Sequence, residues 1–412
     1  MTHKTVALYT DAYRGLSAQT WWLSLVMLIN RSGTMVVPFM TLYLTQHLNY
    51  SITQAGYVMG LFGLGSITGA LVGGKLTDRI GFYAVQLIAL CGGGALFIVL
   101  GFMNSLLHIC LTTFLLSVVN EAFRPANATA IAAYSTSGNV TRSFSLNRLA
   151  INLGWAAGGA LGGVVASHNY TWLFWIDGLT NLGAAVLLLI FLPYKSIRAF
   201  QHHNKKEQTG SFVPSPYRDK KYVYFLLLTT LFATCFFQLF TLQPVYYKEA
   251  LQLSLYLIGV LMAINGILLA FVEMVVVYRL EGKKKNTWFI ALGVFLVALS
   301  YMILNISFVP AFLIAFASTL LITFGEILAM PFMNAFWVSR TIPQNRGQYA
   351  SLYSITYALG QIIAPALGSQ IVSAGGFTAL WWVIGGLGCI NSLLFRWVIK
   401  EVEEPKVLAQ AK

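Results

Sequence analysis

Charged residues are scarce in this sequence. Only 9% of its 412 residues are Asp, Glu, Lys or Arg, whereas 57% are hydrophobic. A soluble protein of this length carries about 25% charged residues. Most of the chain must therefore lie where charge is costly, which argues against a soluble domain and indicates a protein embedded in a lipid bilayer.

Cysteine is rare as well, and motifs of covalent chemistry are missing. The four cysteines (Cys91, Cys110, Cys235 and Cys389) all fall within apolar stretches, so we expect packing residues and no disulfide framework. The sequence has no phosphate-binding loop, no metal-ligand cluster and no nucleophilic triad. We therefore expect no enzyme, no metal or cofactor site, and no transport driven by nucleotide hydrolysis.

The net charge of +13 is the one feature that could suggest a nucleic-acid-binding protein. The lysines and arginines are spread over many short loops, however, with no aromatic-basic module between them. We therefore expect no nucleic-acid partner. A bias of basic residues toward one side of a membrane explains the charge better.

Long apolar segments account for most of the chain. Because these segments are apolar nearly all round, their length and not their periodicity predicts membrane-spanning helices. One long polar connection, 194–221, divides the chain into an N-terminal six-helix domain (1–193) and a C-terminal six-helix domain (222–412). The twelve predicted spans are 21–44, 53–74, 83–103, 106–133, 143–166, 171–193, 222–247, 255–278, 286–307, 309–336, 348–373 and 377–399.

The basic residues predict how these spans are oriented. Of the 26 lysines and arginines, 22 fall in the tails and in the loops of one side, three fall in spans, and only Lys248 falls in a loop of the other side. Short loops rich in lysine and arginine stay in the cytoplasm. We therefore expect a multi-pass protein of the inner (cytoplasmic) membrane with both termini in the cytoplasm.

The two halves of the sequence repeat each other. Residues 153–162 (Leu-Gly-x-x-x-Gly-Gly-Ala-Leu-Gly) match 359–368 (Leu-Gly-x-x-x-Ala-Pro-Ala-Leu-Gly), and Glu121 matches Glu326 at nearly the same offset. Such a repeat in one orientation implies an all-α fold of two six-helix bundles, related by a pseudo-twofold axis along the membrane normal. A substrate cavity is then expected between the bundles, near the midplane of the membrane.

The polar segment between spans 2 and 3 carries the clearest motif. It reads Gly74-Lys-Leu-Thr-Asp78-Arg79-Ile-Gly81 and resembles the loop signature of the major facilitator superfamily, G-x-L-x-D-R-x-G-R-K, with Phe-Tyr in the place of the final Arg-Lys. The resemblance implies that Asp78 lies near a helix N-terminus and an arginine of the other half, where it latches the outward-facing state. An ordinary polar turn is the alternative. Glu281 is a weaker counterpart of Asp78 in the second half.

Span 5 carries glycines at helical spacing. Gly154, Gly158, Gly162 and Gly163 form a pattern that resembles the G-x-x-x-G-P-x-x-G-G signature of drug:proton antiporters, with Gly159 in the place of the proline. Small residues at this spacing also allow two helices to pack closely, and both interpretations stay open. The lone arginine of span 1, followed by Pro-Phe-x-x-x-Tyr-Leu, adds to the resemblance to this subgroup of multidrug and dipeptide exporters.

Only four of the 13 acidic residues fall inside spans: Glu121, Asp177, Glu273 and Glu326. None of the histidines lies deep in a span, so a proton carrier must be one of these carboxylates. Glu121 is the first candidate, because Arg124 follows three residues later and shares its helix face, and Glu326 is its counterpart. Glu273 lies near the end of span 8, where it caps a gate or reaches the loop lysines. Asp177 is expected to be structural more than coupling.

Three arginines, Arg31, Arg124 and Arg148, are predicted inside spans. A charge at the bilayer centre costs about 2.5–3.5 kcal/mol, so we expect them to tune the carboxylates or to clamp an anionic group. A static ion-pair network is the alternative. Arg124 also stands where the resemblance puts an arginine associated with proton transfer. Side chains that suit an amphipathic solute in the cavity are Asn30, Phe237, Gln238, Gln243 and Tyr246.

Together these features predict a monomeric secondary active transporter that exchanges protons for a small amphipathic solute by alternating access. Its expected partners are the solute, protons and the lipid bilayer. One alternative is a proton-coupled uptake symporter, for example of peptides; of the E-x-x-E-R motif of those symporters only Arg31 is present. A second alternative is a transporter-like protein without proton coupling.

Overall fold

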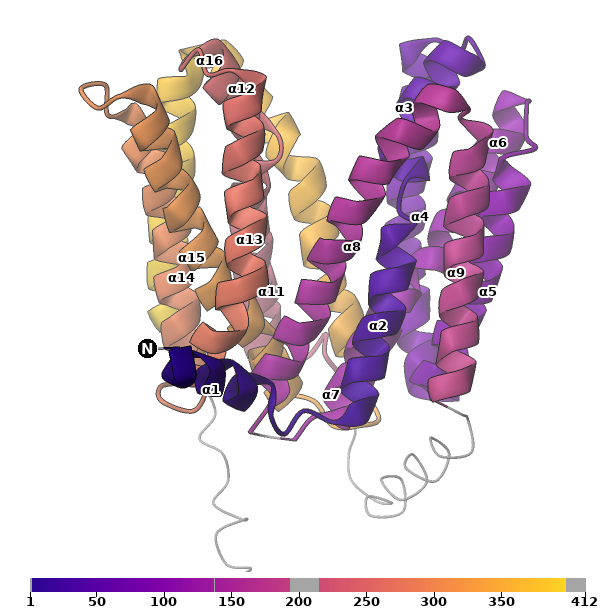
Figure 1. The fold of residues 1–412 in the computed structure, drawn as a ribbon, viewed down its shortest axis with the longest axis horizontal. Coiled ribbons are helices and arrows are strands. Elements are labelled where there is room, and N and C mark those ends of the chain that lie inside the picture. Colours follow the sequence, from indigo (N-terminus) through magenta and orange to yellow (C-terminus); the bar gives the residue numbers. More distant parts are fainter. Residues whose placement is uncertain (1, 137, 193–214, 398–412) are drawn as a thin grey trace, which may run out of the picture.

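The part of the chain that the structure describes forms twelve membrane-spanning helices. The computed structural model describes residues 2–136, 138–192 and 215–397, and the regular structure in these ranges is helical (Figure 1). Eleven helical stretches in this part of the chain are long and apolar enough to cross a membrane. The last of them, α16 (Arg346–Trp397), is broken at Gly376, which has a φ of 73° and therefore a backbone that favours glycine. It comprises two spans, which brings the total to the predicted twelve.

Polar residues before several helices explain where they begin. The side chains of Ser17, Ser51 and Ser254 each accept a hydrogen bond from a backbone N–H of the first turn that follows, which satisfies a donor that the helix itself leaves free. The spans of the first bundle are α2 (Ala18–Ser32) continued by α3 (Val36–Leu42) and a π-helical turn (Tyr43–His47), α4 (Ile52–Ile80), α5 (Phe82–Leu100), α6 (Leu106–Glu121) continued by α7 (Phe123–Tyr134), α8 (Val140–His168) and α9 (Thr171–Phe191).

The second bundle repeats this arrangement. Its spans are α11 (Lys220–Phe236), continued by a 3-10 turn (Phe237–Leu239) and α12 (Leu242–Glu249), α13 (Leu255–Leu280), α14 (Asn286–Met302) with a 3-10 turn (Ile303–Asn305), α15 (Ala311–Ser339) and the two parts of α16. Most of the predicted linker 194–221 lies outside the described residues, which resume at 215.

Close helix packing follows the sequence repeat. A Cβ atom on Gly154 of α8 would lie 2.6 Å from Cβ of Arg31 on α2, and a Cβ on Gly360 of α16 would lie 2.4 Å from Cβ of Ala233 on α11. Real Cβ atoms do not approach so closely, so both sites need glycine. The repeated glycine motif therefore packs span 5 on span 1 and span 11 on span 7.

The predicted loop after span 2 is instead helical. Helix α4 continues to Ile80, and only Gly81, with a φ of 93°, separates it from α5. The loop signature thus lies on the last two turns of α4. The apolar segment predicted as span 2 ended at residue 74, because hydropathy measures the part of a helix inside the membrane and not the turns that project beyond it.

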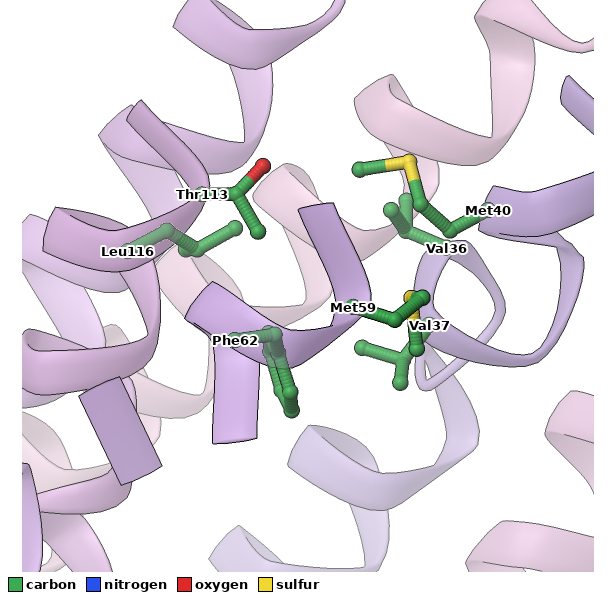
Figure 2. Close-up of a pocket in the computed structure, with 7 residues that line it drawn as sticks. All are labelled: Val36, Val37, Met40, Met59, Phe62, Thr113 and Leu116. Atoms are coloured by element: carbon green, nitrogen blue, oxygen red, sulfur yellow. The ribbon is translucent and has the colours of Figure 1, made fainter. Parts of the chain in front are cut away.

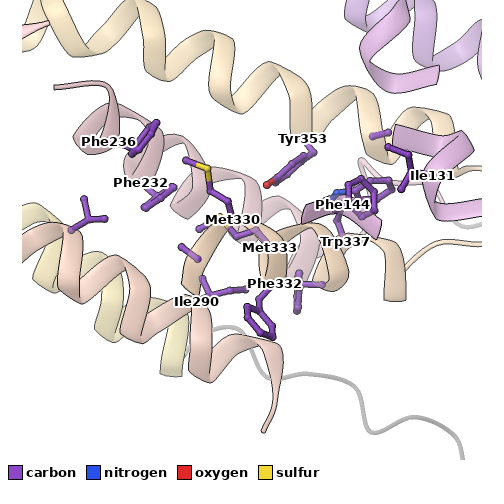
Figure 3. Close-up of a cluster of buried hydrophobic side chains, with 14 of the residues drawn as sticks. Ile131, Phe144, Phe232, Phe236, Ile290, Met330, Phe332, Met333, Trp337 and Tyr353 are labelled. Atoms are coloured by element: carbon purple, nitrogen blue, oxygen red, sulfur yellow. The ribbon is translucent and has the colours of Figure 1, made fainter. Parts of the chain in front are cut away.

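The two bundles converge at one end of the molecule (bottom of Figure 1), where α4 and α13 end and α8, α11 and α16 begin. We call this the basic end, because Lys75, Arg142, Lys220 and Arg279 lie there. An apolar cluster joins both bundles near it: Figure 3 shows Ile131 and Phe144 of the first bundle beside residues of the second.

At the opposite end the first bundle has an apolar cluster of its own. It surrounds Met40, Leu100 and Phe174 and contains no described residue of the second bundle. In the ribbon view the bundles diverge toward this end (Figure 1). The protein is thus held together at the basic end.

Helix α1 (Thr2–Tyr13) lies across the basic end and contacts both bundles. The hydroxyl of Tyr9 donates to the carbonyl oxygen of Phe271 on α13 at 2.7 Å, and Ala12 packs between Leu146 of α8 and Met274 of α13. Although α1 precedes the first bundle in the chain, it therefore also covers the seam between the bundles.

Candidate functional site

A cavity of about 310 Å³ lies between the two bundles. Its walls come from α2, α7 and α8 on one side and from α15, α16 and the 3-10 turn at Phe237 on the other. The charged residues among its described lining are Arg31, Arg124 and Arg148, and no carboxylate is among them. A volume of this size is at the lower end of the range for small-molecule sites.

Glycines of α8 bring this helix against α2 and so position Arg31. A Cβ on Gly158 would lie 3.2 Å from the carbonyl oxygen of Arg31, and one on Gly162 would lie 2.9 Å from a ring carbon of Phe39. Around Gly163 the nearest atom is 4.0 Å away. Of the glycines predicted to pack span 5, Gly154, Gly158 and Gly162 are thus in tight contact, and at Gly163 the packing leaves room for a side chain.

Glu121 and Arg124 form an ion pair within the first bundle. Glu121 ends α6 and Arg124 stands in the first turn of α7, with Nε of the arginine 2.7 Å from Oε2 of the glutamate. The Glu121 side chain is 6% exposed and that of Arg124 is 35% exposed, so the carboxylate is enclosed while the guanidinium reaches the cavity.

Arg148, Glu273 and Glu326 form a second cluster, which bridges the two bundles. Arg148 on α8 lies 3.0 Å from Oε2 of Glu273 on α13 and also pairs with Oε1 of Glu326 on α15. All three side chains are at most 12% exposed. From the sequence, Glu273 was expected either to cap a gate or to reach the loop lysines. In the structure its partner is Arg148.

The bridging cluster carries an imbalance of charge. One guanidinium neutralises one carboxylate, and two carboxylates are present, so the cluster has an excess of one negative charge when both are ionised. Oε1 of Glu273 and Oε2 of Glu326 are enclosed, and the side chains of Ser145 and Asn265 lie close to the two carboxylates.

Asp78 contacts the other bundle at the basic end. Its carboxylate accepts hydrogen bonds from the backbone N–H of Gly347 (2.7 Å) and of Gln348 (3.0 Å), which begin α16, and from the amide of Gln348 (3.1 Å). An acidic group is favoured at a helix N-terminus, where backbone N–H groups are free. A Cβ on Gly74 would lie 2.6 Å from the carbonyl oxygen of Gly347, so the two helices touch there.

Glu281 makes the equivalent contact in the second half. Its carboxylate accepts from the backbone N–H of Thr141 at 3.1 Å and from Nε of Arg142 at 3.0 Å, at the beginning of α8. Each acid at the end of one span thus binds the N-terminus of a span in the other bundle, and we call these two sets the latch contacts. Arg79 is exposed, and its side chain makes no hydrogen bond or ion pair with the described residues.

Sequence reasoning placed Asp78 at a helix N-terminus of the other half, as the structure shows, but it missed which residues contact the two acids. It did not single out Gly347, Gln348, Thr141 or Arg142, although the repeat contained the signal. Because spans 5 and 11 are matched elements, a contact between the end of span 2 and the start of span 11 requires its counterpart between spans 8 and 5.

Asp177 lies within the first bundle as a helix cap. Its carboxylate accepts from the backbone N–H of Met35 at 2.9 Å and of Val36 at 2.9 Å, where α3 begins after the break in span 1. This contact satisfies N–H groups that the short helix leaves free. The geometry favours a structural role for Asp177.

Of the five side chains predicted for the cavity, only Phe237 lines it. The other four are engaged in helix packing: the amide of Asn30 donates to Asn181 (2.8 Å), that of Gln238 to the carbonyl oxygen of Ala364 (2.9 Å) and that of Gln243 to Ser318 (3.1 Å), while the hydroxyl of Tyr246 donates to the carbonyl oxygen of Leu304 (2.7 Å). The polar residues that do line the cavity include Asn127, Asn147, Asn334 and Gln361.

A second, much smaller cavity lies within the first bundle, between α3, α4 and α6 (Figure 2). It measures about 10 Å³ and is lined by apolar side chains apart from Thr113. A water molecule needs about 10–15 Å³ and at least two polar partners. This space is a packing gap and offers no site for a solute.

Comparison with known sequences relates the whole chain to membrane transporters. The family model of the Major Facilitator Superfamily matches residues 22–362 and 282–412. An uncharacterized MFS-type transporter of Bacillus subtilis, YttB, is 28% identical over 364 residues, covering 86% of this chain and 88% of that protein. A Na(+), Li(+), K(+)/H(+) antiporter of Planococcus maritimus is 23% identical over 404 residues, covering 90% and 93%.

Among solved structures, that of the human organic anion transporter MFSD10 (TETRAN) has the same fold. It superposes with a TM-score of 0.71 over 92% of this chain and 100% of that chain, at 15% sequence identity. At this identity the likeness concerns the fold alone.

Proposed function

The chain belongs to the Major Facilitator Superfamily of secondary transporters, and we propose that it couples transport of a small amphipathic solute to protons through the Arg148–Glu273–Glu326 cluster. The single observation that carries this proposal is that two enclosed carboxylates share one arginine across the two bundles. A proton bound there changes the contact that holds the bundles together.

Protonation weakens the bridge. A protonated glutamate has lost the charge that attracts Arg148, so the free energy of the state closed at the basic end rises relative to the state open there. The bundles then rock around the cavity, which lies between them. Glu121 is a weaker candidate than its sequence position suggested, because its partner Arg124 belongs to the same bundle and stays close in both states.

Antiport is the first candidate for the direction of coupling. The sequence resembles drug:proton antiporters, and the Planococcus maritimus relative is described as a cation/proton antiporter. In antiport the solute and the proton bind in alternate halves of the cycle, so each must disfavour the other.

Symport is the second candidate, and the distribution of charge favours it. Arg31, Arg124 and Glu121 have an excess of one positive charge, whereas the bridging cluster has an excess of one negative charge. An anion at the first group and a proton at the second would neutralise both at once. Binding both together then costs less than binding either alone.

Proteoliposomes that contain a pH-sensitive dye separate the candidates. A panel of amphipathic acids, alcohols and amines is added outside, with no pH gradient at the start. Antiport predicts that a transported compound makes the lumen more alkaline, and symport predicts that it makes the lumen more acidic. Uptake of labelled compound with no pH change in the lumen would reject proton coupling. The Glu326→Gln variant is the control, and we expect it to lose the pH change.

We also propose that the basic end faces the cytoplasm, in an inner membrane, on the basis of the bias of lysine and arginine. A cysteine introduced at position 208, in a variant whose four native cysteines are replaced by serine, tests this orientation. An impermeant maleimide should label it in inside-out vesicles only. Labelling of intact spheroplasts would refute the orientation.

A further inference from the structure

Arg31 is a buried cation that forms no direct ion pair or hydrogen bond with the described residues. The residue is 8% exposed. The arginines nearby are paired: Arg124 with Glu121, and Arg148 with Glu273 and Glu326. A buried charge is costly unless it is paired, so Arg31 needs either a functional partner or a compensating gain.

The space in front of Arg31 is the cavity itself. Arg31 and Arg124 both line it. Arg124 uses its Nε for Glu121, which leaves the rest of its guanidinium available. Two guanidinium groups near one space can hold a carboxylate or sulfonate through paired N–H donors.

The facing wall suits an apolar body. Phe237, Met330, Tyr353 and Tyr357 line the cavity from the second bundle, opposite the arginines of the first. The cavity of about 310 Å³ has room for a compact solute with one charged end. Its two walls thus differ in character, with the positive charge concentrated on one side.

We propose that Arg31 and Arg124 form a subsite for the anionic group of an amphipathic organic solute, whose apolar part lies against the aromatic wall of the second bundle. This inference rests on the proposed transport function, and it adds the chemical class of the solute. Arg31 supplies the positive charge that has no ion-pair partner, and Arg124 supplies a second guanidinium group with N–H donors. Glu121 keeps Arg124 oriented by holding its Nε.

Binding of matched compounds to the purified protein tests the proposal without any gradient. The probes are 4-phenylbutyrate, 4-phenylbutanol and 4-phenylbutylamine, together with the analogous sets built on a naphthyl and an octyl body, measured by isothermal titration in nanodiscs of zwitterionic phosphatidylcholine. In each set the acid should bind most tightly. Preference for the amine, or no binding of any acid at millimolar concentration, would overturn the proposal.

Variants connect the preference to the residues. Arg31→Gln should weaken binding of the acid by about tenfold or more, since a hydrogen bond to a charged group is lost, and should leave binding of the alcohol unchanged. Arg31→Lys keeps the charge but lacks the paired N–H donors of a guanidinium, and it should give an intermediate loss of affinity for the acid. Arg279→Gln, at an exposed position outside the cavity, is the matched control and should bind the acid as the wild type does. Wild-type affinity in Arg31→Gln would refute the subsite.

Two further readouts make the result unambiguous. Because Arg31 forms no ion pair or hydrogen bond with the described residues, Arg31→Gln should unfold at the same temperature as the wild type or a higher one, so a loss of affinity cannot be attributed to misfolding. In nanodiscs that contain phosphatidylglycerol the affinity for the acid should be unchanged. Competition by this lipid would assign the subsite to a lipid phosphate and overturn its assignment to a solute. Proton coupling enters none of these measurements, so the proposed function can fail while the subsite stands, and the reverse.

Discussion

Two ion clusters near the cavity look alike in sequence and differ in architecture. The Glu121–Arg124 pair lies within one bundle, on two consecutive helices of one span. The Arg148–Glu273–Glu326 cluster lies between the bundles, on α8, α13 and α15. Each contains an enclosed glutamate beside an arginine, so the residue types alone do not distinguish them.

The difference decides what each cluster can do. A pair inside a rigid bundle has the same geometry in every state, so protonating it changes both states of the transporter equally and shifts nothing. A cluster between bundles is broken when they rock, so protonating it changes their relative free energies. Contacts between the bundles should therefore control the conformational state, and contacts within one bundle should control stability.

The largest effect is expected for Arg148→Met. The substitution leaves two enclosed carboxylates without a counter-charge, and breaking a buried pair costs about 3–5 kcal/mol. We expect a strongly lowered unfolding temperature, measured by differential scanning fluorimetry. The triple variant Arg148→Met, Glu273→Gln, Glu326→Gln has no unpaired charge and should recover much of this loss. A triple variant no more stable than Arg148→Met would show that charge is not the cause.

The latch contacts should come next in size. Asp78→Asn weakens two hydrogen bonds to the N-terminus of α16, and Glu281→Gln weakens those to the start of α8; a hydrogen bond to a charged group contributes about 1.5–3 kcal/mol. Each variant should populate the state open at the basic end, measured by alkylation of a cysteine introduced at Ser354 in the cavity.

The two latches lie at different helix pairs, so their effects should add. Each single variant should unfold near the wild-type temperature, since both bundles stay intact. Wild-type alkylation rates in the double variant would show that the latches do not hold the closed end.

Within the first bundle the glycines of α8 offer a matched pair. Gly154→Ala forces a Cβ to 2.6 Å from Arg31, whereas Gly159→Ala, on the same helix, meets no atom within 4 Å. Overpacking costs about 1–3 kcal/mol, so the first variant should unfold at a lower temperature and the second should not. Equal unfolding temperatures would mean that α2 and α8 are not packed as closely as described.

The smallest effect is expected for Asp177→Asn. The asparagine still accepts hydrogen bonds from the beginning of α3 but without charge, and loss of a helix cap costs about 1 kcal/mol. The unfolding temperature should fall slightly, and the conformational equilibrium should stay unchanged. Loss of proton coupling in this variant would assign Asp177 the role that we give to the bridging cluster.

Much of this architecture was predictable from the sequence. The twelve spans follow from apolar length, and the two bundles from the repeat of 153–162 at 359–368. The pairing of Glu121 with Arg124 followed from their spacing on one helix, and the structure confirms it.

Apart from the contact of Asp78 with a helix N-terminus of the other half, which the resemblance implied, the contacts between bundles were not predictable in the same way. Arg148, Glu273 and Glu326 lie on helices whose sequence separation gives no distance between them. The choice of Gln238 and Gln243 for the cavity failed for a related reason: an apolar span does not reveal which face meets the other helices of its own bundle, and both amides lie on that face.

Protonation of the bridging carboxylates should control which end of the protein is open, and this can be tested without knowing the solute. Spin labels at Tyr57 and Tyr256 report the separation of the bundles at the end opposite the basic end, and labels at Ile80 and Lys283 report it at the basic end; all four positions are exposed. Distances are measured by electron paramagnetic resonance in nanodiscs between about pH 5 and pH 9, a range that covers the raised pKa values of enclosed carboxyl groups in proteins. Cysteine-free protein carrying each label pair is the starting point.

The state open at the basic end should bind more protons, because its carboxylates no longer pair with Arg148. A fall in pH stabilises the state that binds more protons. Lowering the pH should therefore widen the basic end and narrow the other. Glu273→Gln combined with Glu326→Gln should be open at the basic end at every pH, whereas Glu121→Gln should titrate as the wild type does. The account is contradicted if the double variant keeps the wild-type titration, or if Glu121→Gln abolishes it.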